Sequence, residues 1–217
     1  MMAASKKKRR ILITAGGTRE YIDPVRFLSN AGSGQMGYAL ARAALRAGHR
    51  VTLISAPTTL KPPAQAELLR VVSCQDMFRA VKEKFPQSDC LIMTAAVSDY
   101  TPVKKEKTKM KKSRGILTLR LKPTPDILAW AGRHKKKGQI LVGFALEDKN
   151  LKQNAEQKLR RKNLDLIVAN KPDAIAARQS AVFLKSPSGP WLALPYQSKQ
   201  RTAGCILRMI EKLFAEN

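Results

Sequence analysis

The sequence predicts an α/β fold, a Rossmann-like doubly wound and mostly parallel sheet, with a small β-hairpin extension and a mobile basic arm. Three observations lead to this prediction. First, short apolar segments alternate with segments of helical periodicity. Second, the first apolar segment runs straight into a glycine loop. Third, a chain of 217 residues that is 44% hydrophobic can build one substantial core. We expect residues 1–10 to form a basic disordered tail and residues 11–217 a single domain.

The first βαβ unit carries most of this argument. Ile11–Ala15 is a five-residue apolar strand candidate. Met36–Ala47 places its apolar side chains at helical spacing, and Gly48 gives that helix its end. Val51–Ser55 is the second strand. This order implies parallel strands joined by a right-handed crossover.

The pattern then repeats along the chain. Ser73 and Asp76 resemble a capping box that opens a helix, and Asp89–Ala95 is another strand. Thr124 is expected to cap the next helix, with Pro125 in its first position. The remaining expected elements are strands at Ile140–Phe144 and Leu164–Ala169, a helix from about Lys149 to Lys162, a hairpin of Ala181–Lys185 and Trp191–Tyr196, and a final helix that turns Ile206, Met209, Ile210 and Leu213 inward.

A basic segment interrupts the repeat. Val103–Gly115 holds seven Lys or Arg residues and one acid, without an apolar period, which predicts the mobile arm. Leu117, Leu119 and Leu121 alternate after it and predict a strand.

Composition limits the function classes. No run of 18 apolar residues is present, so we expect a cytoplasmic protein without a membrane span. Three widely spaced cysteines are expected to be buried, reduced thiols, and no metal-binding spacing is found. The formal net charge of +25 fits either a polyanion such as nucleic acid or small, multiply charged anions.

Two local patterns favour the small anion. Gly32, Gly34 and Gly37 fit G-x-G-x-x-G at a helix start, where free N–H groups can meet a phosphate; the alternative is a turn that binds nothing. At about 100° per residue, Lys158 and Lys162 fall about 40° apart on the inward edge of a helix. Lysines there either snorkel or meet an anion, and we expect a ligand phosphate, not a protein group, as their partner.

Several ordered segments resemble the bacterial phosphopantothenoylcysteine synthetases, the ligase half of the coenzyme A flavoproteins. The resemblance covers the chain from Ile11 to Leu213, departing at Ala31-Gly32, where serine-like residues are commoner, and at Gln35, where lysine is usual. The matching segments are Ile11–Glu20, Ile22–Asn30, Gly32–Gly37, Ala95–Tyr100, Lys109–Lys112, Thr124–Leu128, Gly143–Ala145 with Glu147, Lys158–Ile167 and Ala169-Asn170.

This resemblance implies a reaction. The carboxylate of 4′-phosphopantothenate would attack the α-phosphate of CTP, in the presence of Mg²⁺, to give an acyl-cytidylate and pyrophosphate. The amine of cysteine would then displace CMP and give phosphopantothenoylcysteine. The resemblance also implies a homodimer with sites near the subunit interface, no bound FMN, and a separate decarboxylase that takes the product.

The resemblance also implies roles for residues. Lys109 is the expected catalytic cation of the activation step, and Asn30 the residue of the coupling step; the alternatives are a solvated charged loop and a turn-forming asparagine. The expected nucleotide-binding residues are Ala95, Asp99, Lys109, Pro125, Asp126, Ile127, Leu128, Phe144, Lys158 and Lys162. The expected substrate and phosphate loop comprises Gly16, Gly17, Thr18, Arg26, Asn30, Ser33 and Gly34. Metal ligands are not assigned.

Two other functions compete with this one. An NAD(P)- or flavin-binding oxidoreductase would use the same βαβ opening, but the glycine loop is interrupted and no acid follows the second strand, where Ile54–Pro57 stands. A nucleic-acid-binding module would explain the charge, but no helix-turn-helix, zinc or aromatic-rich motif accompanies it. We therefore expect any nucleic-acid binding to be incidental.

Overall fold

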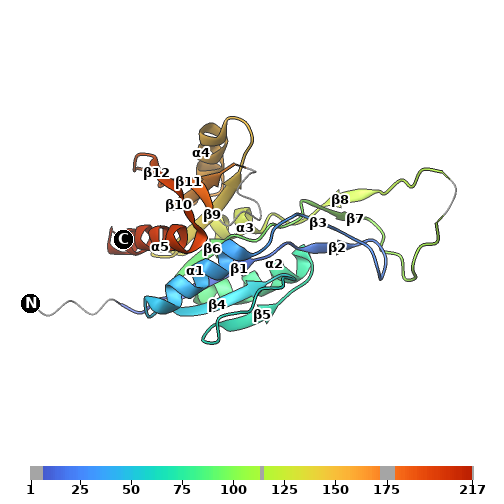
Figure 1. Ribbon diagram of the computed structural model, residues 1–217, viewed down its shortest axis with the longest axis horizontal. Coiled ribbons are helices and arrows are strands. Elements are labelled where there is room, and N and C mark those ends of the chain that lie inside the picture. Colours follow the sequence, from blue (N-terminus) through green and yellow to red (C-terminus); the bar gives the residue numbers. More distant parts are fainter. Residues whose placement is uncertain (1–6, 113–114, 172–178, 217) are drawn as a thin grey trace, which may run out of the picture.

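The computed structural model describes residues 7–112, 115–171 and 179–216 and is built around one eight-stranded sheet (Figure 1). The expected tail lies largely outside these ranges. The strands follow in the order β12 (Leu192–Ser198), β11 (Gln179–Lys185), β10 (Leu166–Asn170), β9 (Ile140–Leu146), β6 (Cys90–Met93), β1 (Arg10–Ala15), β4 (Arg50–Ser55) and β5 (Glu67–Arg70). The strands from β10 to β5 are parallel, and β11 and β12 are antiparallel. This is a doubly wound arrangement, as predicted.

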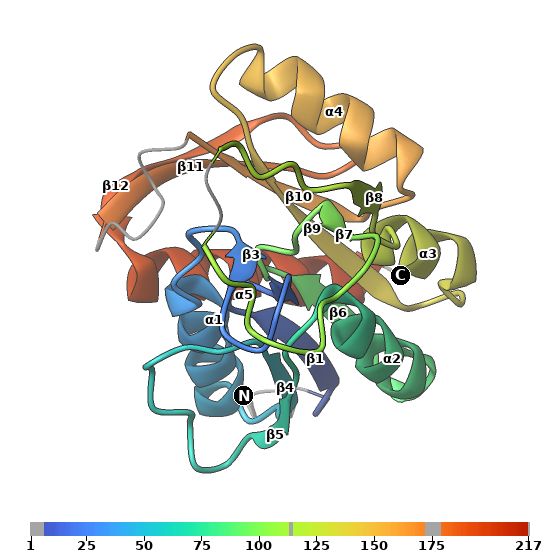
Figure 2. The same cartoon turned by 90° about the vertical axis from the view of Figure 1, so that its right-hand side faces the viewer.

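Helices cover both faces of the sheet (Figure 2). One face carries α1 (Gln35–Arg46) and α5 (Lys199–Glu216), and the other carries α2 (Cys74–Lys84), α3 (Ile127–His134) and α4 (Leu151–Arg161). A short 3₁₀ helix, Phe85–Gln87, follows α2.

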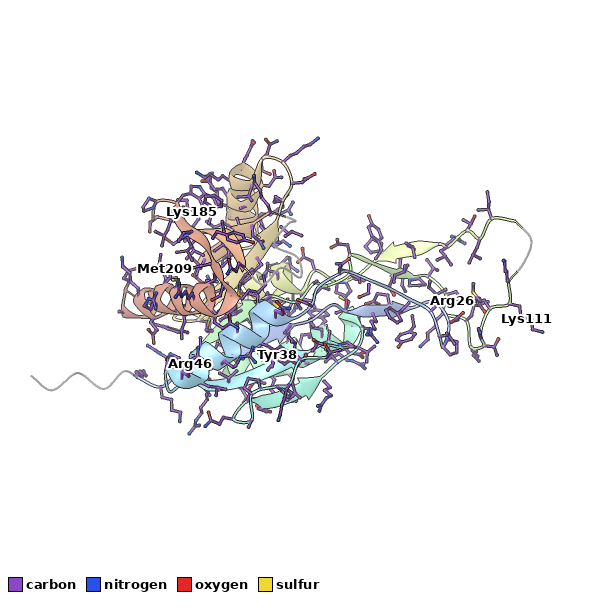
Figure 3. The ribbon with its side chains drawn as sticks, viewed as in Figure 1. Arg26, Tyr38, Arg46, Lys111, Lys185 and Met209 are labelled. Carbon is purple, nitrogen blue, oxygen red and sulfur yellow. The ribbon has the colours of Figure 1, made fainter. Side chains whose placement is uncertain are left out.

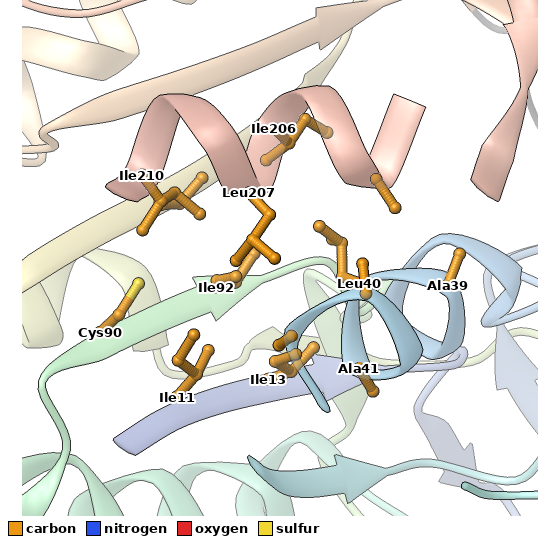
Figure 4. Close-up of a cluster of buried hydrophobic side chains, with 14 of the residues drawn as sticks. Ile11, Ile13, Ala39, Leu40, Ala41, Cys90, Ile92, Ile206, Leu207 and Ile210 are labelled. Carbon is orange, nitrogen blue, oxygen red and sulfur yellow. The ribbon is translucent and has the colours of Figure 1, made fainter. Parts of the chain in front are cut away.

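The two cores follow from the period of two in the strands. Ile11 and Ile13 of β1 lie in the core under α1 and α5, and Leu12 lies in the other. Figure 4 shows Ile206 and Ile210 of α5 turned toward the sheet, where both are fully buried. The inward face predicted for the last helix is thus confirmed.

The capping chemistry was predicted correctly for α2 and wrongly for α3. The Ser73 hydroxyl accepts from Asp76 N at 3.1 Å, and an Asp76 carboxylate oxygen accepts from Ser73 N at 3.0 Å. In α3 the cap is Asp126, which accepts from Ala129 N at 2.9 Å. Thr124 instead donates its hydroxyl to Ser98 O at 2.6 Å, which places this residue before the helix.

Two small antiparallel pairs, absent from the sequence prediction, form a projecting arm. They are β2 (Arg19–Tyr21) with β3 (Phe27–Ser29), and β7 (Tyr100–Pro102) with β8 (Leu121–Pro123). We use "the arm" for residues 19–29 and the described parts of 100–123, which extend together away from the sheet (Figure 1). The two halves are joined where Glu106 N donates to Ile22 O at 2.8 Å.

The strand expected after the basic segment is present but begins later than the alternating leucines predicted, because β8 starts at Leu121 and Leu117 is exposed. Leu117 and Leu119 extend beyond the sheet, where no strand of the described residues pairs with them. The edge strand β5 was also missed, because its four residues do not alternate strongly.

No helix in the described part of the chain is long and apolar enough to cross a membrane. The cysteines are all free: Cys74 and Cys90 are buried as expected, and Cys205 is half-buried.

Candidate functional site

The loops that follow β1 and β6 meet at the carboxyl edge of the sheet, where doubly wound folds bind ligands. Gly17 and Ala96 form a parallel bridge, and Ala96 N donates to Gly16 O at 2.9 Å. The fully buried Thr18 accepts from Ser98 N through its hydroxyl at 2.9 Å. Gly16, Gly17 and Thr18 therefore fasten these two loops together, and their predicted role in phosphate binding stays a prediction.

Two adjoining cavities open at this edge. The larger, about 700 Å³, runs along residues 29–37 at the start of α1, and we call it the loop pocket. The smaller, about 410 Å³, runs along residues 123–128 at the start of α3, and we call it the α3 pocket. Both have volumes typical of small-molecule sites. The residues common to the two linings are Ala95, Val97, Asp99, Phe144 and Lys158.

The loop pocket depends on glycine at the start of α1. Gly34 caps the helix with φ 79°, a left-handed conformation, and has no side chain to cap the N–H groups; Ser33 Oγ accepts from the first of them, Gln35 N, at 3.5 Å. A Cβ on Gly37 would lie 2.6 Å from both Ala15 Cβ and Thr94 Oγ1, so only glycine lets the helix start this close to the sheet. The other N–H groups at the start of α1 are available to an anion.

The α3 pocket combines apolar walls with paired charges. Its lining includes most of the predicted nucleotide-binding residues. Lys158 reaches it from within α4, and Lys162 reaches it from the C-terminal end of that helix. Lys162 Nζ lies 2.9 Å from an Asp126 carboxylate oxygen, and Lys158 Nζ donates to Phe144 O at 2.6 Å. The inward placement of both lysines is confirmed.

The expectation that these lysines have no protein partner is wrong. Lys158 is bound to a main-chain carbonyl of β9, and Lys162 meets the carboxylate that caps α3. A ligand phosphate would therefore share or replace existing contacts. Arg160 and Arg161, on the outer face, are exposed as the helical arithmetic predicts.

Charges inside the α3 pocket shift two pKa values. Burial opposes ionisation of Asp126, but hydrogen bonds from Ala129 N and Lys162 hold the pKa of its carboxyl below its ordinary value. Burial, reinforced by the nearby charge of Lys162, lowers the pKa of Lys158. Lys158 is thus a destabilised cation that an added anion would stabilise.

Asn30 and Ser33 both line the loop pocket, and their predicted role in a substrate loop stays a prediction. Asn30 Nδ2 donates to Val97 O at 3.0 Å, which ties the glycine loop to the loop after β6. The carbonyl of Ser33 accepts from Thr58 Oγ1 at 3.0 Å. The amide of Asn30 therefore has a structural contact in addition to any role toward a ligand.

Arg26 and Lys109 lie apart from both pockets, on the arm. Arg26 Nη2 donates to Met110 O at 3.1 Å, and Asp23 accepts from Met110 N at 3.2 Å. Figure 3 places Arg26 well outside the sheet, and Lys109 is exposed. The structure brings these two predicted cations together with each other but not with the pocket residues.

Sequence reasoning missed two groups in the loop pocket, Lys199 at the start of α5 and Glu147 after β9 as an acid facing Lys158. Lys199 follows the polar end of β12, where a lysine reads as an ordinary surface residue, so the sequence carried no signal for it. Glu147 belongs to the matching segment Gly143–Ala145 with Glu147, but the resemblance implied no function for it.

The described residues contain no group of three His, Cys, Asp or Glu side chains arranged to hold a metal ion. Two carboxylates line the α3 pocket, those of Asp99 and Asp126, and they do not belong to a three-residue metal cluster. This donor set fits a Mg²⁺ held mainly by phosphate oxygens of a ligand, which is the usual manner of Mg²⁺ in nucleotide sites.

Comparison with known proteins gives consistent matches over nearly all of the chain. Residues 6–214 match the family described as DNA/pantothenate metabolism flavoprotein C-terminal domain. The Coenzyme A biosynthesis bifunctional protein CoaBC of Bacillus subtilis is 47% identical over 97% of this chain and 53% of its own length. A Cysteine/Cysteine sulfinic acid decarboxylase of an unknown prokaryotic organism is 49% identical over 75% of this chain and 45% of its own.

The solved C-terminal domain of a Coenzyme A biosynthesis bifunctional protein CoaBC is 39% identical. Its TM-score is 0.84, with 99% of this chain and 100% of that one covered. The chain thus corresponds to a whole solved domain, yet it spans only about half the length of the curated relatives it matches. The similarity therefore does not assign to this chain all the activities that are named for those longer proteins.

Proposed function

Since the chain belongs to the family of the DNA/pantothenate metabolism flavoprotein C-terminal domain, we propose that it is a phosphopantothenate–cysteine ligase of coenzyme A biosynthesis, acting in the cytoplasm. The observation that carries the proposal is the pair of adjoining pockets with one shared wall. A ligase that activates a carboxylate with a nucleotide needs two binding sites that meet at the reacting atoms.

The α3 pocket suits the nucleotide. Phe144 and Leu128 give apolar walls for a base, Asp99 can accept from a base or ribose, and Lys158 and Lys162 supply cations for phosphates. The loop pocket suits the phosphorylated acid, whose carboxylate would lie at the shared wall. We propose CTP as the nucleotide, with Mg²⁺ bound through its phosphates.

At the shared wall the reaction has two steps. A carboxylate oxygen forms a bond to the α-phosphorus of CTP while the bond to the pyrophosphate leaving group breaks. The nitrogen of cysteine then attacks the acyl carbon, loses a proton, and CMP leaves. Lys158 stands where phosphate charge develops in the first step, and Asn30, on the loop-pocket side, can donate to the acyl carbonyl in the second.

We further propose that the arm completes the site, either by closing over it or by reaching the site of a second copy in a homodimer. Arg26 and Lys109 would then add two cations to the lysines that already line the pockets. Closure also excludes water, which would hydrolyse an acyl-cytidylate. Light scattering of the purified chain distinguishes a monomer from a dimer.

The proposal is tested by product formation. The chain, 4′-phosphopantothenate, cysteine and Mg²⁺ are incubated with each nucleoside triphosphate in turn, and phosphopantothenoylcysteine and pyrophosphate are measured. We expect product with CTP and at least about 10-fold less with ATP, GTP or UTP, because one or two placed polar contacts discriminate bases by this much. Equal rates with all four would contradict the cytosine pocket, and no product with any would contradict the ligase.

Nucleotide binding should also take up protons at alkaline pH. The pKa of Lys158 is lowered from 10.5 in the free protein, and a bound phosphate would raise it again. Between these two values, binding should add up to about one proton per site, and affinity should fall as pH rises. Calorimetry in two buffers of different ionisation enthalpy measures the uptake. Lys158→Met should abolish it; uptake that persists in this variant would assign the proton elsewhere.

A further inference from the structure

A third cavity opens at the amino edge of the sheet, opposite the edge that holds the loop pocket and the α3 pocket. Its volume is about 600 Å³, and we call it the amino-edge pocket. The starts of β1, β4 and β5 and the ends of α1 and α2 line it. Gln35 of α1 lines the loop pocket and Leu45 of the same helix lines the amino-edge pocket, so the two cavities lie roughly 15 Å apart along α1. A ligand in the amino-edge pocket therefore occupies a separate site.

The amino-edge pocket gathers basic side chains from distant parts of the chain. Those in its lining are Lys8, Arg10, Arg50 and Lys84. Arg10 and Arg50 lie side by side, because they are paired in the parallel register of β1 with β4. Neighbouring strands are about 4.8 Å apart, and like charges placed opposite each other on them repel. An anion between the two guanidinium groups would remove this repulsion.

The acids around the pocket already have partners. Glu67 is the one acid in the lining among the described residues. Its carboxylate accepts from Lys84 Nζ at 3.0 Å and from Thr52 Oγ1 at 2.8 Å, and these hydrogen bonds hold its pKa below the ordinary value. Asp89, next to the pocket, accepts from Arg10 N at 2.6 Å. These carboxylates are thus engaged by groups of the protein.

Two cations of the lining are left without an acid. Lys8 and Arg50 make no ion pair with any residue in the described part of the chain, whereas Arg10 Nε lies 3.7 Å from an Asp89 carboxylate oxygen. Lys8 and Arg50 are both exposed, so neither has lost its hydration to the protein interior. Their charges are available to a ligand.

Helix ends usually favour cations, because their last carbonyl groups carry partial negative charge. At the end of α1 the carbonyls of residues 43–45 accept from the N–H groups of residues 47–49. At the end of α2 the carbonyl of Lys84 accepts from Ser88 Oγ at 2.8 Å. The carbonyl groups at both helix ends are therefore engaged, and the charge that faces a ligand is mainly that of the basic side chains.

We propose that the amino-edge pocket binds a small molecule through its phosphate groups, with Arg50 and Lys8 as the anchoring cations and Arg10 beside them. A guanidinium group donates in a planar fork that fits two phosphate oxygens. A cavity of about 600 Å³ is in the range of small-molecule sites and has room for more than one phosphate group. The inference does not depend on the proposed ligase function. It gives a part of the net charge of +25 a specific role.

The test follows each cavity separately in the full chain. Inorganic pyrophosphate and ATP are each titrated, and amide NMR signals are recorded for Val51 and Thr52 at the amino edge and for Gly37 in the loop pocket. We expect both probes to shift the signals of Val51 and Thr52 to saturation, with a Kd distinct from any read at Gly37. No saturable shift at the amino edge with either probe would overturn the inference, whether or not the chain proves to be a ligase.

Single variants identify the anchoring cations. Arg50→Gln and Lys8→Gln should each raise the Kd read at the amino edge by about 10-fold, the usual effect of losing one charge-assisted contact, and should leave binding at Gly37 unchanged. Arg46→Gln is the matched control, because Arg46 is exposed near the cavity but outside its lining (Figure 3). It should change the Kd by less than about twofold. An equal weakening by Arg46→Gln would overturn the site and leave only a diffuse attraction of charge.

A short DNA duplex serves as a third probe, because a chain of this charge also attracts polyanions. We expect pyrophosphate and ATP to saturate the amino-edge signals without the duplex and to keep their dependence on Arg50 at about 0.15 M salt, where diffuse attraction is largely screened. If the duplex alone shifts these signals, the small-molecule site is overturned and the surface belongs to nucleic acid. Melting curves confirm that every variant compared is folded.

Discussion

Replacing Lys109 with glutamine should lower the rate of pyrophosphate release by about 10²- to 10³-fold, the usual effect of removing one placed group that stabilises transition-state charge. The side chain is exposed on the arm, so the variant should fold normally. In the proposed mechanism its cation acts only when the arm covers the bound triphosphate and charge builds up on the leaving group. Pyrophosphate release under single-turnover conditions measures this step.

Asn30→Asp should affect the other half of the reaction. The amide donates to Val97 O, and an aspartate in its place presents a carboxylate that neither donates there nor stabilises an acyl oxygen. We expect pyrophosphate release to remain within about threefold of wild type, while product formation falls by about 10²-fold or more and acyl-cytidylate accumulates. Quenched-flow analysis with mass spectrometry detects the trapped intermediate.

Lys107→Gln serves as the matched control for Lys109→Gln, because it removes the same charge from a neighbouring exposed position of the arm. It should leave both steps near the wild-type rate. If Lys109→Gln and Asn30→Asp lose the same step to the same extent, the division of roles between them is wrong. If Lys107→Gln equals Lys109→Gln, the arm acts by its general charge alone.

The sequence predicts the interior of this fold better than its arm, for a physical reason. Strands β1, β4, β6, β9 and β10 are buried on both faces, so hydrophobicity alone marks them as runs. The arm strands β7 and β8 are three residues each and owe their existence to pairings such as Tyr100 with Pro123, far apart in the chain. No local pattern records such a pairing. Likewise Asp126 displaced Thr124 as the cap of α3 because Thr124 was taken by a tertiary contact.

The site shows the same division. Periodicity placed Lys158 and Lys162 on the inner face of α4, since a helix relates residues by a fixed rotation. It did not reveal that each already has a protein partner, because Phe144 and Asp126 come from other elements. Lys199 was missed for a similar reason: what makes it unusual is its burial in a cavity, and the other residues of that cavity come from distant parts of the chain.

Removing Lys158 or Lys162 should weaken CTP binding by about 1–3 kcal/mol, or about 5- to 150-fold in Kd, which is the usual cost of losing a charge-assisted partner. Both lysines line the α3 pocket, where the triphosphate is proposed to bind. The Kd of each alanine variant is measured by calorimetry, and its Tm by circular dichroism.

The partners seen in the structure set the expected effect on stability. Lys158→Ala removes a hydrogen bond to Phe144 O together with a buried charge, and these two effects oppose each other. Lys162→Ala removes an ion pair to a carboxylate that is 51% exposed, and solvent screening limits such a pair to less than about 1 kcal/mol. Both variants should therefore stay folded at assay temperature, and the Tm of each should change by no more than about 5 °C.

Arg160 and Arg161 provide internal controls on the same helix. Both are exposed, and Arg160 lies 3.4 Å from Glu156 on the outer face, so neither can reach the α3 pocket. Arg160→Ala and Arg161→Ala remove the same formal charge as the lysine variants and should leave the Kd within about twofold of wild type. Losses as large as those of Lys158→Ala would mean that the overall positive charge of the chain, rather than two placed ammonium groups, holds the nucleotide. In that case the losses should also disappear together at high salt, because only diffuse attraction is screened to that extent.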